Sequence, residues 1–266
     1  DLAGLALQLA RWGVEVDELV WLDPPPAAAY AQARDLLQRL GALDERGVLT
    51  VHGQAMAELP AHPRIAHLLL RGQALGLGEL ACDLAALLGE RDILRGGQCG
   101  AGADLHSRLA LLSGESRAAR GAQGGVQRAR QLAKQFQGYL RRVAVSEPVS
   151  DPEHGRWLGA LLAFAYPDRI ARQRREGGAE YRLANGRAAQ FGEADALMKH
   201  SWLVVADLGS RQGQREERIY LAAELEPALF ESVLAEQVSS QDLLEWDERE
   251  GVLRAERQRK VGDLVL

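Results

Sequence analysis

The chain has 266 residues, 47% of them hydrophobic and 26% charged, with a formal net charge of −5 at pH 7. This length and apolar content support about two or three small domains with buried cores. No apolar run reaches the roughly 20 residues that a membrane span needs, and no signal peptide is visible. Cys82, Cys99 and six scattered histidines show neither a disulfide framework nor metal-ligand spacing. We therefore expect a cytoplasmic protein with no membrane contact and no metal site.

The net charge hides a strong division along the chain. Residues 1–103 carry 8 basic and 13 acidic side chains, residues 104–215 carry 18 and 11, and residues 216–266 carry 6 and 13. The basic excess is therefore concentrated in the middle of the chain. Local excess, rather than total charge, decides whether a surface attracts phosphate groups.

Residues 1–51 have the local pattern of a winged helix. Apolar residues recur at helical spacing over residues 27–40, where we expect Asp23 to cap the helix and Gly41 to end it. Short apolar runs then flank residues 44–47, a pattern typical of a tight hairpin. The segment holds 4 basic and 8 acidic residues, which favours a structural hub over a nucleic-acid reader.

Residues 52–150 are predicted to form a helical bundle. Their glycine-rich stretch at 89–105 lacks the Gly-Lys-Ser/Thr ending of a phosphate loop, and no strand precedes it, so we interpret it as a connector. A helix predicted at 126–143 separates an apolar face from a basic one. The apolar face contains Val126, Ala129, Leu132, Phe136, Tyr139, Leu140 and Val143. The basic face contains Arg128, Arg130, Lys134, Arg141 and Arg142.

The basic face of this helix has two interpretations. No acidic residue interleaves with its five bases, so ion pairs within the helix cannot account for them. Contact with a nucleic-acid backbone is one interpretation, and an ordinary solvated face of a bundle helix is the other.

Residues 151–266, after a polar link at 144–153, are predicted to form a small β-barrel. Glu-Gly-Gly and Asn-Gly turn signals separate the first strand patterns, and an OB-like barrel is the expected fold. The strand patterns lie at 169–174, 180–184, 187–191, 202–208, 218–225, 243–247 and 252–257, with a helix at 227–238. The whole chain is thus predicted to be an α+β multidomain protein: a winged helix, then a helical bundle, then a small OB-like β-barrel.

Basic side chains gather on the first strands of the predicted barrel. OB-like barrels bind single strands through a basic groove and stacking aromatic rings. A solvated face with local ion pairs is the alternative interpretation. Trp202 and Trp246 are expected in the core, because apolar neighbours flank each of them. The candidate nucleic-acid-binding residues here are Arg169, Arg172, Arg174, Arg182 and Arg187.

Two series of residues indicate a family. The first series is Trp21, Pro24-Pro25, the run 40–44, the run 47–50, Gly53, Met56-Ala57, Leu59-Pro60 and the run 62–64. It resembles the accessory region after the motor of DEAH-box RNA helicases. The second series is ERDIL at 90–94, Ala103-Asp104-Leu105, Arg108-Leu109, AYPDRIARQR at 165–174, YRLANGRAA at 181–189 and WLVVADL at 202–208. It is similar to the bacterial HrpB family of the DEAH/RHA superfamily.

This resemblance implies an ATP-dependent RNA helicase from which this chain is a fragment. RecA-like motor domains would precede Asp1, a further domain would follow Leu266, and ATP and Mg²⁺ would bind in the motor. The chain has neither a GxxxxGK[ST] nor an Asp-Glu-x-His motif, so we assign no catalytic or cofactor-binding residue and expect the fragment itself to be inactive. The winged helix would fasten the rest to the motor, while a ratchet helix and the barrel would form one wall of a single-stranded RNA channel.

Three other functions are weighed against this one. A protein-interaction scaffold would dock the motor or a partner with little RNA contact, and would rely on the acidic ends of the chain. An enzyme in its own right lacks support, because no nucleophile, paired-carboxylate or metal spacing is present. A winged-helix transcription factor is disfavoured, because its recognition helix would offer only Arg34 and Arg39 beside Asp35.

Overall fold

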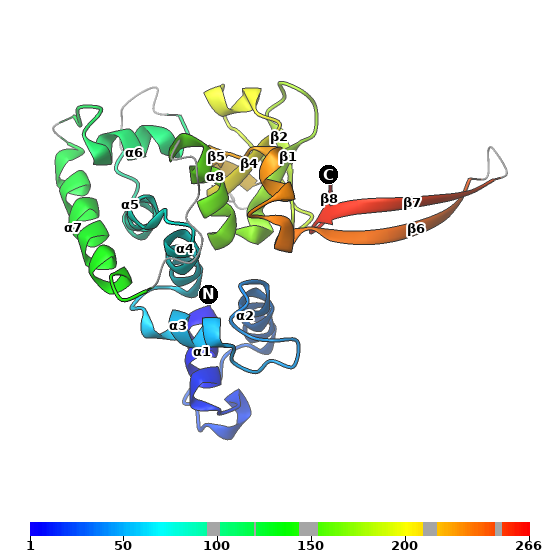
Figure 1. Ribbon diagram of the computed structural model, residues 1–266, viewed down its shortest axis with the longest axis horizontal. Helices are drawn as coiled ribbons and strands as arrows, with labels where there is room; N and C mark the ends of the chain where they lie inside the picture. The colour runs from blue at the N-terminus through cyan, green and yellow to red at the C-terminus, as the bar shows by residue number, and fades with distance from the viewer. Residues whose placement is uncertain (95–101, 120, 144–153, 210–216, 248–251) are drawn as a thin grey trace. The chain divides into compact units, whose positions relative to one another are not determined.

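A computed structural model describes residues 1–94, 102–119, 121–143, 154–209, 217–247 and 252–266. Cys99 and the polar link at 144–153 lie outside these residues. The chain forms two compact units, Asp1–Gly89 with Gln127–Pro152 and Glu90–Val126 with Glu153–Leu266, whose elements are drawn in Figure 1. The α+β multidomain architecture is confirmed. The division at 51/52 and 150/151 stays a prediction, and residues 90–126 group with the second unit.

Short helices build the first unit, and α1 packs against three of them, α2, α3 and α4. α2 buries Tyr30, Ala33, Leu36 and Leu37, as its spacing predicts, and Gly41 follows its end with a φ of 66°. The helices are α1 (Ala3–Trp12), η1 (Val16–Glu18), α2 (Ala27–Arg39), α3 (Val51–Glu58), α4 (Pro63–Ala74) and α5 (Gly78–Gly89).

The expected cap of α2 is wrong. The residue at the N-cap position is Pro26, which makes no side-chain cap hydrogen bond. Pro24, Pro25 and Pro26 separate Asp23 from the first turn. Because proline fixes φ near −65° and restricts the residue before it to extended backbone, the chain stays extended through this run.

The predicted hairpin at residues 44–47 is confirmed. Asp44 Oδ1 accepts hydrogen bonds from the backbone N–H groups of Arg46 and Val48, at 2.9 and 2.8 Å. Leu43 and Leu49 form an antiparallel bridge across the turn. Thr50 then caps α3 by accepting from the N–H of Gly53 at 2.9 Å.

A closed barrel of strand order β1-β2-β3-β5-β4 forms the centre of the second unit. β3 and β5 pair in parallel and the other neighbours are antiparallel. Its core includes Tyr181, Leu203 and Ile219, and Tyr181 donates its hydroxyl proton to His200 O at 2.8 Å. The strands are β1 (Ile170–Gln173), β2 (Glu180–Leu183), β3 (Ala188–Gln190), β4 (Trp202–Gly209) and β5 (Glu217–Glu224).

Helical segments cover and complete this barrel. α8 packs on β4 and β5, and α6 contacts β5. The helix predicted after Pro227 is two short 3₁₀ turns instead. The segments are α6 (Leu105–Ser113), α8 (His154–Ala165), η2 (Pro167–Arg169), η3 (Ala196–Lys199), η4 (Pro227–Glu231) and η5 (Ala235–Gln237).

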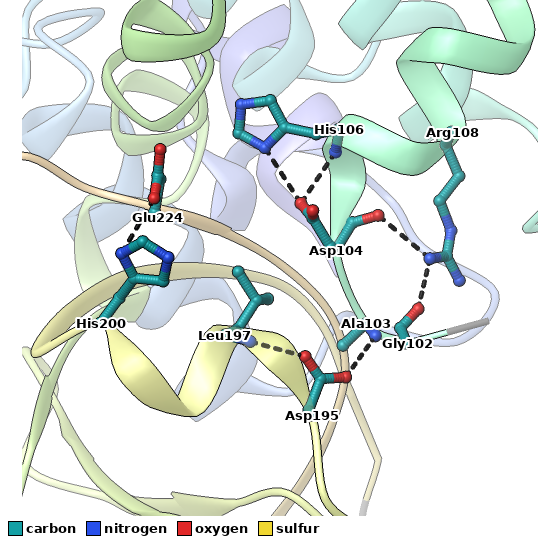
Figure 2. Close-up of polar contacts among 9 residues, drawn as sticks. All are labelled: Gly102, Ala103, Asp104, His106, Arg108, Asp195, Leu197, His200 and Glu224. Atoms are coloured by element: carbon teal, nitrogen blue, oxygen red, sulfur yellow. Dashed lines mark hydrogen bonds and ion pairs between the residues drawn. The ribbon is translucent and has the colours of Figure 1, made fainter. Parts of the chain in front are cut away.

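The segment before α6 is fastened to the barrel by backbone contacts (Figure 2). Asp195 Oδ2 accepts from the N–H of Ala103 at 2.7 Å, and its Oδ1 accepts from Leu197 N at 2.9 Å, which caps η3. Ala222 N on β5 donates to Ala103 O at 2.9 Å. The carboxylate of Asp195 therefore joins the segment before α6, at Ala103, to η3, the turn before β4.

The last strands do not join the barrel, contrary to the prediction. β6 (Ser239–Asp247), β7 (Val252–Val261) and β8 (Leu264–Val265) form a separate sheet of order β6-β7-β8, which leaves the barrel as a long ribbon in Figure 1. The barrel already closes through β3 and β5, so it has no free edge for further strands. Trp202 is buried as expected, but Trp246 on the ribbon is 60% exposed, so its predicted core position is wrong.

Candidate nucleic-acid interface

α7 (Gln123–Leu140) carries the first group of candidate residues. Its apolar side buries Val126, Ala129, Phe136 and Leu140, so the predicted helical spacing is confirmed. Just after its C-terminal end, Gln73 Nε2 of α4 donates to Val143 O at 3.1 Å. The helix is thus held by one face and near one end, which leaves the opposite face to solvent.

The five candidate bases, which we call the α7 basic face, lie on α7 or in the two residues after its end at Leu140, and all are exposed: Arg128, Arg130, Lys134, Arg141 and Arg142. The sequence has no acidic residue between Glu115 and Glu147. Lys134, Arg141 and Arg142 have no ion-pair partner within the described parts of the chain. The α7 basic face therefore presents positive charge that its own helix does not neutralise.

One acidic residue from a neighbouring helix acts on this face. Burial and the nearby Glu79 raise the pKa of Asp83 on α5, whereas the charge of Arg130 lowers that pKa. Arg130 is therefore close enough to Asp83 for part of its charge to be balanced. The best candidates for phosphate contact on α7 are accordingly Lys134, Arg141 and Arg142.

The barrel arginines are less uniform than the sequence predicts. Arg174 pairs with Glu180 at 3.4 Å and Arg187 with Glu217 at 3.0 Å, both on the surface. Arg169 donates to Ala206 O at 2.8 Å, and its guanidinium lies 4.7 Å from the centre of the Tyr166 ring. These three side chains each have a partner within the fold.

Arg172 and Arg182 are directly opposite each other on β1 and β2. Like charges at such a position are destabilising. Arg172 turns away: its Nη1 donates to Val265 O, and its guanidinium lies 5.5 Å from the centre of the Trp202 ring. Arg182 is exposed, with no ion-pair partner among the described residues. The structure thus brings these two arginines together, but only Arg182 is left for an external anion.

A cavity of about 490 Å³ adjoins Arg172 at the root of the ribbon. Two further arginines line it, but each already has an acidic partner. Arg257 Nε lies 2.7 Å from Asp242 Oδ1, and Arg259 pairs with Glu231. These two ion pairs offset the charges of Arg257 and Arg259. The cavity is therefore a weaker candidate for phosphate binding than α7.

Tyr139, like Trp246, is a residue that the sequence pattern places wrongly. The pattern predicts it on the apolar face of α7, but its side chain is 48% exposed. At about 3.6 residues per turn, Tyr139 lies at the edge of the apolar face, next to Gln135. A helical wheel centred on the buried residues would have shown this edge position.

No helix in the described residues is long and apolar enough to cross a membrane. No three His, Cys, Asp or Glu side chains in the described ranges are placed to hold a metal ion.

Comparison with known proteins gives two family matches. Residues 33–61 match the winged helix of the helicase associated domain (HA2), and residues 237–266 match the connector region of the ATP-dependent RNA helicase HrpB. ATP-dependent RNA helicase HrpB of Escherichia coli is 32% identical over the whole chain, which spans 30% of that relative's length. A crystal structure of the Escherichia coli DExH-box NTPase HrpB matches the whole chain with a TM-score of 0.76 at 32% identity, and the chain covers 30% of it.

The resemblance to the HrpB accessory region is confirmed. A second crystal structure, of the Escherichia coli DEAH/RHA helicase HrpB, agrees with a TM-score of 0.76 at 29% identity over the whole chain and 30% of that structure. A probable ATP-dependent RNA helicase of Saccharomyces cerevisiae is 33% identical over 35% of the chain and 13% of that relative. The relatives of this chain are therefore RNA helicases.

The two family matches fall on distinct elements. The HA2 match at residues 33–61 covers the end of α2, the hairpin at 44–47 and α3, and overlaps the predicted winged helix over residues 33–51. The HrpB connector match at residues 237–266 coincides with β6, β7 and β8. The strands that match the connector are therefore the ones that form the ribbon and not the barrel.

Proposed function

We propose that this chain is a nucleic-acid-binding accessory module of an ATP-dependent RNA helicase. In this proposal, the α7 basic face of the first unit and Arg182 of the second unit each contact the backbone of single-stranded RNA. The module contributes one wall of the channel for the strand. ATP and Mg²⁺ act in RecA-like motor domains of the same, longer, cytoplasmic polypeptide. The chain itself carries no catalytic residue in this proposal.

The observation that carries the proposal is the charge of α7. Five exposed bases lie on this helix or directly after it, with no acidic residue nearby in the sequence, and such a surface attracts phosphate over a Debye length of about 10 Å. Backbone contacts of this kind hold a strand without selecting its sequence. Such contacts suit an enzyme that moves along RNA.

The direct test is anisotropy of a short labelled single-stranded RNA with the 266-residue chain, across a salt series. Each phosphate contact contributes a slope of about −0.7 in log affinity against log salt. The double variant Arg141→Glu with Arg142→Glu should weaken binding and reduce this slope by roughly 1.4. Unchanged affinity and slope would overturn the proposal for α7.

Arg46→Glu is a matched control for charge reversal. Arg46 is also an exposed arginine of the first unit, at the hairpin of residues 44–47. Its reversal changes the net charge of the protein without altering α7. It should leave the salt slope unchanged, which separates a local contact from a general effect of charge.

The second candidate function is a scaffold that docks the motor or a protein partner with little RNA contact. The observation that favours it is the exposed apolar surface of the ribbon, where Leu244 is 68%, Trp246 60% and Leu253 62% exposed. A scaffold predicts no RNA binding even at low salt. It also predicts that the α7 variants leave the RNA affinity of the motor-containing protein unchanged.

A further inference from the structure

Tyr139 is an aromatic ring in an unusual place for a bundle helix. Its side chain is 48% exposed, whereas Phe136, one turn earlier on α7, is only 7% exposed. The neighbour of Tyr139 along the helix surface is Gln135, four residues before it. Arg142 follows three residues after Tyr139, just past Leu140, the last residue of the helix. Both are exposed. An aromatic ring and an amide therefore share one stripe of α7 that faces solvent, and a guanidinium follows at its C-terminal end.

The composition of this stripe points to an unpaired nucleic-acid strand as its occupant. The surrounding surface is positive, since no acidic residue lies between Glu115 and Glu147, and an anionic chain complements it. Bases of a single strand are free to stack on aromatic side chains, which paired bases are not. Glutamine amides can donate to or accept from base edges in either orientation. A phosphodiester chain with exposed bases meets all three groups.

We propose that Tyr139 is a stacking platform for one base of the RNA strand, with Arg142 on an adjacent phosphate and Gln135 at the edge of the same base. This inference rests on the proposed function. It adds base stacking, a contact that does not contribute to the salt dependence of binding. Along α7, Gln135 is displaced from Tyr139 by about 6 Å towards the N-terminus, and Arg142 lies three residues beyond Tyr139, at the C-terminal end of the helix. Both groups are thus within reach of a nucleotide whose base lies on the ring.

Stacking and phosphate contact are distinguished by their response to salt. Tyr139→Ala should lower the affinity for single-stranded RNA by about 5- to 150-fold at every salt concentration, because stacking is worth that much per base. The slope of log affinity against log salt should stay unchanged, since no counterion-releasing contact is lost. Tyr139→Trp should retain or improve affinity, because it keeps a ring.

An RNA with abasic positions makes the test specific. If a base stacks on Tyr139, the wild-type chain should bind the abasic strand more weakly than the normal one. Tyr139→Ala should bind the two strands alike. An equal loss with both strands would instead show a general effect on the helix and would overturn the inference.

Trp246→Ala is the matched control, because Trp246 is also an exposed aromatic residue but lies on the ribbon, in the second unit. It should leave the RNA affinity unchanged. If wild type binds no RNA at low salt, the proposed function fails. If wild type binds, the Arg141 and Arg142 variants weaken binding and Tyr139→Ala does not, then the stacking inference alone fails.

Discussion

The guanidinium of Arg108 and the carboxylate of Asp92 form a two-pronged pair. Arg108 Nε lies 3.2 Å from Asp92 Oδ1, and Nη2 lies 3.0 Å from Oδ2. Their side chains are only 4% and 16% exposed. Arg108 Nη1 also donates to the carbonyl oxygens of Gly102 and Asp104, so one side chain holds both ends of the segment between residues 92 and 104 (Figure 2 shows the part at 102–108).

Arg108→Met should lower the free energy of unfolding by about 3–5 kcal/mol, because it leaves the largely buried carboxylate of Asp92 without its partner. Urea unfolding followed by circular dichroism measures this change. Arg39→Ala provides the comparison, because the Arg39–Asp35 pair is of similar length, 2.9 Å, but both side chains are about half exposed, 47% and 59%. Arg39→Ala should lower the free energy of unfolding by no more than about 0.5 kcal/mol. Equal costs would show that the Arg108 pair has no special role.

Acid should destabilise the first unit through His67. His52 Nε2 lies 2.7 Å from His67 Nδ1. Burial, then the charges of His52 and Arg71, lower the pKa of His67 from 6.5 to about 3. The folded protein therefore keeps His67 neutral where the unfolded chain takes up a proton. This contribution to stability is complete above pH 6.5 and is lost as the pH falls from about 6.5 towards 3.

His67→Gln isolates this contribution from the carboxylates that also titrate in acid. The wild-type free energy of unfolding should fall more steeply than that of the variant between about pH 6 and 4, by up to about 1.4 kcal/mol per pH unit. Urea unfolding at a series of pH values gives both slopes. Parallel pH profiles would mean that His67 titrates normally in the folded protein.

What the sequence could predict differs between helices and the barrel for a physical reason. The burial of Val126, Ala129 and Leu140 follows from a repeat within one helix, which a single stretch of sequence contains. Barrel closure instead depends on parallel pairing of β3 with β5, which are separated by β4 in the chain. No local pattern in the sequence indicates that pairing. The sequence therefore predicts the strands of the ribbon as part of the barrel as well.

The same distinction, between contacts that are local in the chain and contacts that are distant, explains why the sequence predicts the bases of α7 better than the arginines of the barrel. The α7 basic face could be predicted, because its members lie on one helix or within two residues of its end. The partners of Arg172 and Arg187 are Val265 and Glu217, which lie far along the chain from them. Only the folded structure shows that these two side chains are engaged.

Trp202 and Trp246 should respond in opposite ways to truncation, although the sequence predicts both in the core. Trp202 is 7% exposed and its ring centre lies 5.2 Å from that of Phe230. Trp202→Ala should cost about 3–5 kcal/mol of the free energy of unfolding. Trp246→Ala should change it by no more than about 0.5 kcal/mol, because the ring is 60% exposed. A large loss in the second variant would show that the ribbon contributes to the core of its unit.

Alanine substitutions at Gly159 and Gly138, which both lie within helices, should have opposite effects on stability. A Cβ on Gly159 of α8 would lie 2.0 Å from Glu224 O on β5, so the glycine lets the helix approach the barrel. Gly159→Ala should push the two elements apart and cost at least about 1–3 kcal/mol. A Cβ on Gly138 of α7 would meet nothing within 4 Å, so Gly138→Ala should stabilise the helix by about 0.5–1 kcal/mol. Thermal unfolding of both variants checks the signs, and a rise in the melting temperature of Gly159→Ala would contradict the close packing of α8 on β5.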